Sequence, residues 1–180
     1  MRPLLQSEVS YFECPNCGFV QTEGPYWLEE AYEETINISD TGIVARNPTN
    51  RNIVISKLLM LVGLNQKVVD FDGGYGLLVR LLRDGGVDAW HSDPYCDNLV
   101  AVGFEDDGSH VFLVTVFEAF EHFVDPNTVL AKMFALAPNI LLSTDLIPKP
   151  MPKFDDWWYY QSRTRTAHRF ASKTYASIPG

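Results

Sequence analysis

The chain has 180 residues, of which 46% are hydrophobic and 21% charged, and its formal net charge is −9. This length and composition are typical of an ordinary globular domain with a sizeable core, and the acidic balance argues against nucleic-acid binding through phosphate contacts. Three cysteines do not indicate a disulfide scaffold. Neither a signal-peptide pattern nor a long apolar run is found, so we expect a cytoplasmic protein without a membrane partner.

The composition changes near residue 49 and predicts two parts. Residues 1–48 form an extension with a cysteine pair, an amphipathic helical stretch YWLEEAYEETI and the polar turn ISDTG. Residues 49–180 carry the main domain. Its first predicted helix is capped by Asn50, places Ile53, Leu58 and Leu61 on one face, and ends at Gly63.

Apolar strands and amphipathic helices then alternate along the chain. The predicted strands include KVVDF, VDAWHSD, HVFLVTVFE and NILLSTDL, and the predicted helices between them are GLLVRLLRDGG and DPNTVLAKMFALAP. This alternation indicates βαβ units. Near-continuous apolar strands favour a sheet that is covered on both faces. We therefore predict an α/β fold: a Rossmann-like, doubly wound, mainly parallel sheet in three layers.

The stretch VVDFDGGYG is the first strand–loop–helix connection of this sheet. The dinucleotide pattern G-x-G-x-x-G fails here, because its third glycine would fall on Val79. The spacing from Asp70 through Gly74 to Gly76 instead matches the loop that holds the amino-acid part of S-adenosylmethionine. Asp93, at the end of the next strand, could accept hydrogen bonds from ribose hydroxyls. A tight turn without a ligand is the alternative.

Several segments together resemble one enzyme family. They are VVDFDGGYGLLVRLLRDGG, HSDPYCDNL, VFEAFEHFVDP, LLSTDLIP and DWWYY. Together they resemble class I S-adenosylmethionine-dependent methyltransferases, most closely a bacterial branch with a cysteine-rich, zinc-binding segment in front. The resemblance runs from about residue 11 to residue 160.

The resemblance implies a set of cofactor-binding residues. These are Asp70, Asp72, Gly73, Gly74, Gly76, Asp93, Pro94 and Glu118. The family usually has glycine where this chain has Asp72. Related chains also have a Gly-Gln-His step after the aromatic cluster, and the sequence RTAH here retains only His168.

The stretch FEAFEH allows three interpretations. If a helix begins there, Glu118, Glu121 and His122 share one face and could hold a divalent metal ion, as in metal-assisted O-methyltransferases. Without a metal, His122 or His168 could act as the general base. In the third interpretation the Glu-His pair only caps the helix and shapes the pocket.

Cys14 and Cys17 form a C-x-x-C pair followed by glycine, which is half of a zinc knuckle. Tetrahedral zinc requires four ligands, and Cys96 belongs to the sheet domain. The resemblance implies an upstream cysteine pair that this chain lacks. A closed zinc site within one chain is therefore not expected, and an unmetallated remnant of the ribbon is the preferred interpretation.

The strand count predicts an incomplete sheet. A methyltransferase sheet ends in an antiparallel pair of strands, and we count five strands before Asp145 with no clear hairpin after it. The last counted strand would then be an apolar edge, which favours association. We expect it to be covered by the aromatic segment WWYY at 157–160 or by a second copy of the chain. WWYY and the basic residues near it could alternatively form a wall for a flat or anionic acceptor.

These patterns predict an S-adenosylmethionine-dependent methyltransferase that acts on a small molecule. The zinc-segment relatives suggest a sugar or a sugar nucleotide as acceptor. The catalytic candidates are Glu121, His122 and His168. The alternative is a methyltransferase-like binding module without turnover, which Asp72 and RTAH favour and which the intact Asp70 and Asp93 oppose.

Overall fold

A computed structural model describes residues 10–24, 42–150 and 168–169. The chain packs into two compact units, each discontinuous in sequence. One comprises residues 38–117 and 127–143, and the other comprises 1–37, 118–126 and 144–180. Helix α2 (Ile43–Leu61) runs across the boundary predicted at residue 48. The segments YWLEEAYEETI and WWYY lie outside the described residues.

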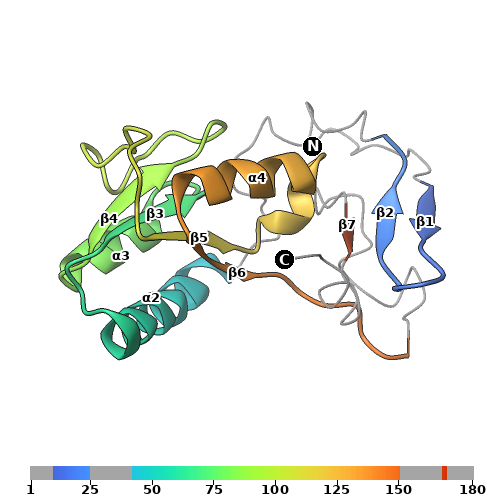
Figure 1. The fold of residues 1–180 in the computed structure, drawn as a ribbon, viewed down its shortest axis with the longest axis horizontal. Coiled ribbons are helices and arrows are strands. Elements are labelled where there is room, and N and C mark those ends of the chain that lie inside the picture. The colour runs from blue at the N-terminus through green and yellow to red at the C-terminus, as the bar shows by residue number, and fades with distance from the viewer. Residues whose placement is uncertain (1–9, 25–41, 151–167, 170–180) are drawn as a thin grey trace, which may run out of the picture. The chain divides into compact units, whose positions relative to one another are not determined.

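A four-stranded parallel sheet forms the centre of the first unit (Figure 1). Its strand order is β4-β3-β5-β6. The strands are β3 (Lys67–Phe71), β4 (Asp88–Ser92), β5 (Leu113–Phe117) and β6 (Asn139–Ser143). All three pairings are parallel. This order confirms the predicted doubly wound sheet, while the predicted count of five strands is one more than this sheet has among the described residues.

The helices cover both faces of this sheet. The connections through α3 (Leu77–Asp84) and α4 (Pro126–Leu136) run in opposite directions from the sheet centre. Right-handed crossovers therefore place these two helices on opposite faces, which gives three layers. Helix α2 packs against α3, and the two share one apolar core with residues from β3, β4 and β5.

Helix α2 begins earlier than predicted and buries a different face. It begins at Ile43, after Gly42, and continues through Pro48, which was taken as part of the preceding extension. Its buried side chains are Val54 and Leu58, spaced by four residues, whereas Leu61 is 72% exposed. Leu58 is buried as predicted, but the prediction was wrong for Ile53 and Leu61, because packing against α3 selects the side of the helix that contains Val54.

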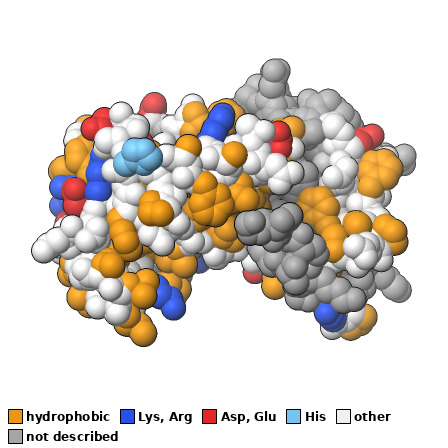
Figure 2. Space-filling view, in the orientation of Figure 1, with side chains coloured by type: hydrophobic (Ala, Val, Ile, Leu, Met, Phe, Trp, Pro, Cys, Tyr) orange, Lys and Arg blue, Asp and Glu red, His pale blue; other side chains and the backbone are white. Residues whose placement is uncertain are grey.

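The C-terminal part of α2 exposes apolar side chains, which contribute to the hydrophobic surface in Figure 2. They are Leu59, Met60, Leu61 and Val62. At the edge of the sheet, no described strand pairs with the outer side of β6. Whether WWYY or a second chain covers this edge stays a prediction.

The second unit contains a small antiparallel sheet of β1 (Tyr11–Glu13), β2 (Val20–Thr22) and β7 (His168–Arg169). It also contains the 3-10 helix η1 (Phe120–His122), which contacts β7. Across the described ranges of both units, no helix is long and apolar enough to span a membrane.

Candidate functional site

The sheet has its topological switch point between β3 and β5. From β3 the chain crosses to β4 on one side, and from β5 it crosses to β6 on the other. The helices thus diverge at the carboxyl ends of β3 and β5, which is where doubly wound proteins bind ligands. The loop after β3, residues 72–76, lies at this point and contains half of the predicted cofactor-binding residues.

Asp70, the fourth residue of β3, is 4% exposed and forms the base of the site. Its register partner Thr115 on β5 donates a hydroxyl hydrogen bond of 2.6 Å to Asp70 Oδ1. Burial raises the pKa of Asp70 to about 7, and the nearby Asp93 charge adds to this rise. The Thr115 hydrogen bond opposes both effects. Asp70 therefore lies under the loop as a buried carboxyl group, close to its midpoint of ionisation at neutral pH.

Two glycines of the loop are required for steric reasons. A Cβ on Gly73 would lie 2.7 Å from Asp70 Oδ2, so the buried carboxyl occupies the space of a side chain. Gly76 precedes α3 with φ +84°, and a Cβ there would collide with the side chain of Asn98. These contacts are sufficient to explain the glycines at these two positions, and no ligand is needed for the explanation.

Asp72 occupies a glycine-like backbone conformation. Its φ is +58°, in the left-handed region that asparagine and aspartate tolerate better than most residues. Its backbone N–H donates a hydrogen bond of 2.7 Å to the Ser92 carbonyl at the end of β4. The aspartate therefore follows the backbone path that a glycine would take here.

Asp93 ties the loop to the end of β4. One of its carboxylate oxygens accepts the Gly74 N–H at 2.9 Å, and the other accepts the Tyr95 N–H at 2.8 Å. Each oxygen retains acceptor capacity. A Cβ placed on Gly74 would meet no atom within 4 Å, so the loop borders open space beside Gly74. Pro94, the remaining predicted cofactor contact, is exposed directly after Asp93.

The predicted catalytic residues belong to the other unit. Glu118 has a left-handed φ of +54°, and only the single turn of η1 follows. The helix that would place Glu118, Glu121 and His122 on one face does not form, because this backbone conformation interrupts it. Glu121 is buried in η1, and His168 lies in β7, which contacts η1. The backbone thus brings the segments of Glu121, His122 and His168 together.

The predicted metal sites are not formed among the described residues. No group of three or more His, Cys, Asp or Glu side chains there could hold a metal ion. Cys14 and Cys17 are free thiols at the turn between β1 and β2. Hydrogen bonds from the backbone amides of Cys17 and Asn16 lower the pKa of the Cys14 thiol. Zinc binding by this turn stays a prediction.

Two residues that hold the loop in place were not predicted from the sequence. Thr115 contacts Asp70, and His91 Nε2 lies 2.7 Å from the Gly74 carbonyl oxygen. Both contacts depend on the register between neighbouring strands, which local patterns do not reveal. The only sequence signal for His91 is its spacing of two residues from Asp93, which places both side chains on one side of an extended chain.

Comparison with known proteins identifies the family. The sequence matches the methyltransferase domain over residues 44–178. The chain belongs to this methyltransferase family. The predicted resemblance to class I S-adenosylmethionine-dependent methyltransferases is thereby confirmed, while its cysteine segment is not. No curated protein matches the sequence.

Solved structures include similar chains. One is CalO1, a methyltransferase in calicheamicin biosynthesis, in its SAH-bound form. It is 12% identical to this methyltransferase domain, with a TM-score of 0.41. The alignment covers 68% of this chain and 46% of the CalO1 chain, so it spans about half the length of that enzyme.

Proposed function

We propose that this domain binds S-adenosylmethionine and transfers its methyl group to a small-molecule acceptor. The main support is the loop at the switch point, where Asp70, Gly74 and Gly76 have the expected spacing and Gly74 borders open space. Asp93 lies against the same loop and can accept hydrogen bonds from ribose hydroxyls. Catalysis would consist mostly of positioning, because the sulfonium already activates the methyl group.

The transfer breaks the bond between sulfur and the methyl carbon and forms a bond between that carbon and the acceptor nucleophile. S-Adenosylhomocysteine leaves, and the acceptor's proton passes to a base. Glu121, His122 and His168 remain our candidates for this base, supported by the contact between η1 and β7. A divalent metal ion at Glu118, Glu121 and His122 is not part of this proposal, because the left-handed backbone at Glu118 interrupts the helix that would align these side chains.

The acceptor class is inferred from the family resemblance and from the charge of the chain. A sugar or sugar nucleotide is suggested by the resemblance to zinc-segment relatives, and the acidic chain favours a small molecule over nucleic acid. A cytoplasmic location is part of the same proposal. Incubation with methyl-labelled cofactor and a panel of nucleotide sugars, free sugars and RNA would identify the acceptor class, and exclusive labelling of RNA would contradict our assignment.

Cofactor binding can be tested by thermal unfolding. At 100 times its dissociation constant, S-adenosylhomocysteine should stabilise the fold by about 2.7 kcal/mol. In a chain of this size that corresponds to a rise of roughly 5–10 °C in Tm. Asp93→Ala should lose most of this ligand-dependent shift, whereas Asp84→Ala, which removes an exposed carboxylate at the far end of α3, should retain it.

An unchanged Tm of the wild-type protein at millimolar ligand would contradict the enzyme assignment. It would favour the alternative of a methyltransferase-like module that has lost its cofactor. That alternative is motivated by Asp72, which stands where the family usually has glycine.

A further inference from the structure

His91 lies beneath the loop, in the middle of a backbone network. It is the fourth residue of β4, is 4% exposed and pairs in register with Asp70 on β3. On its other side, its N–H donates to the Phe104 carbonyl at 2.8 Å and its carbonyl accepts the Asp106 N–H at 2.8 Å. Backbone partners on both sides therefore hold His91 in place, which limits the directions its ring can take.

The His91 ring contacts the loop through one defined hydrogen bond. Nε2 lies 2.7 Å from the Gly74 carbonyl oxygen. A carbonyl oxygen can only accept, so Nε2 carries the hydrogen in this arrangement. Asp93 accepts the N–H of the same glycine at 2.9 Å. Two side chains from the end of β4, spaced by two residues, thus hold Gly74 at its N–H and at its carbonyl group.

These two hydrogen bonds fix the conformation of Gly74. Its N–H belongs to the peptide group before its Cα, and its carbonyl belongs to the peptide group after it. Fixing both groups sets φ and ψ of a residue that has no side chain to restrict them, and Gly74 has φ +57°. The space around a Cβ at this position is open. The backbone of Gly74 is therefore held from the β4 side and borders open space at its Cβ position.

We propose that His91 is a positioning residue that fixes the Gly74 backbone so that the loop is preformed for the cofactor. This inference rests on the proposed function, in which the loop holds the amino-acid end of S-adenosylmethionine. A loop that is already ordered loses less conformational entropy when the ligand binds. A histidine that served only the core would instead contribute to stability without affecting ligand affinity.

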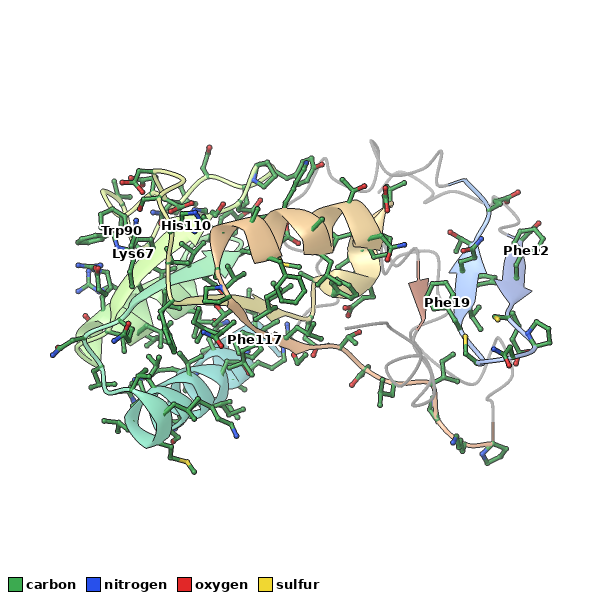
Figure 3. All side chains as sticks on the ribbon, viewed as in Figure 1. Phe12, Phe19, Lys67, Trp90, His110 and Phe117 are labelled. Atoms are coloured by element: carbon green, nitrogen blue, oxygen red, sulfur yellow. The ribbon has the colours of Figure 1, made fainter. Side chains whose placement is uncertain are left out.

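Three substitutions test the hydrogen bond. His91→Leu removes the donor, His91→Asn keeps an amide that is too short to reach, and His91→Gln places an amide N–H near the position of Nε2. The control is His110→Leu, because His110 is exposed and precedes β5, at the end of the strands opposite the loop (Figure 3). Each variant is titrated with S-adenosylhomocysteine in a calorimeter, and amide exchange of Gly74 is measured by NMR without ligand.

We expect His91→Leu and His91→Asn to raise the dissociation constant about tenfold and to accelerate exchange of the Gly74 amide. His91→Gln should bind within about twofold of the wild type, as should His110→Leu. If His91→Leu does not fold, the comparison of His91→Asn with His91→Gln decides the question. A wild type that does not bind the ligand would overturn the proposed function. Equal affinity and equal Gly74 exchange in His91→Asn, His91→Gln and wild type would overturn the role of His91 alone.

Discussion

Replacing Asp70 by asparagine should make the protein more stable, and increasingly so as the pH rises. Burial raises the pKa of the Asp70 carboxyl from 3.8 to about 7 in the folded protein. Below pH 3.8 the group is protonated in both states and has no effect. Between the two pKa values the unfolded chain releases the proton while the folded chain keeps it. The free energy of unfolding therefore falls as the pH rises through this window.

The size of the effect follows from the two pKa values. One pKa unit corresponds to about 1.36 kcal/mol. The raised pKa of Asp70 therefore lowers the free energy of unfolding by on the order of 4 kcal/mol above pH 7. About 2 to 3 kcal/mol of this accumulates between pH 5 and pH 8. An amide cannot ionise, and its oxygen can still accept the Thr115 hydroxyl. The stability advantage of Asp70→Asn over the wild type should grow by that amount between the two pH values.

Urea denaturation of the wild type and of Asp70→Asn at pH 5 and pH 8 would measure this change in relative stability. All other titrating groups are the same in the two proteins, so their contributions cancel in the comparison. Asp84→Asn is the matched control. The stability difference between Asp84→Asn and the wild type should be similar at both pH values, because the Asp84 side chain is exposed to water at the end of α3. If the advantage of Asp70→Asn did not change with pH, the buried carboxyl would ionise normally, and our account of the base of the site would be wrong.

Two further substitutions address the loop. Gly73→Ala should destabilise the fold by about 1–3 kcal/mol and weaken S-adenosylhomocysteine binding, because its Cβ would lie 2.7 Å from Asp70 Oδ2. Gly24→Ala, which meets nothing within 4 Å, is the control, and equal urea midpoints for the two variants would contradict the steric argument. Asp72→Gly should tighten S-adenosylhomocysteine about tenfold in a calorimetric titration, by removing a side chain and a charge that repels the ligand carboxylate. Weaker binding would instead show that Asp72 pairs with the ligand's ammonium group.

The strands and the loop could be predicted because their signals are local. Val68 and Val69 are both fully buried in β3, as expected for a central parallel strand with both faces covered. The glycines of the loop stand where a buried carboxyl and a left-handed turn exclude other residues. Such constraints act within a few residues, so they leave a pattern in the sequence.

What sequence analysis missed depends on pairing between distant segments. Thr115 meets Asp70 because β5 pairs with β3 in one particular register, across 45 residues of chain. The helix considered at Glu118, on which the metal interpretation depended, does not form for a different reason. Propensity and spacing allow it, but Glu118 takes a left-handed conformation and the chain is extended again at Phe123. At Glu118, the context of the fold overrides local preference.

The three aspartates around the loop look alike in sequence and differ in structure. Asp70 is buried behind the loop and bonded to Thr115, and each oxygen of Asp93 accepts a backbone N–H. Asp72 is only partly buried, and its backbone already has the left-handed conformation and the hydrogen bond to Ser92 that fix the loop's path. The substitution of glycine by aspartate therefore changes the charge and the space beside the loop, but not its backbone. A loss of cofactor binding through Asp72 would have to act on the ligand directly, because the loop that receives it is intact.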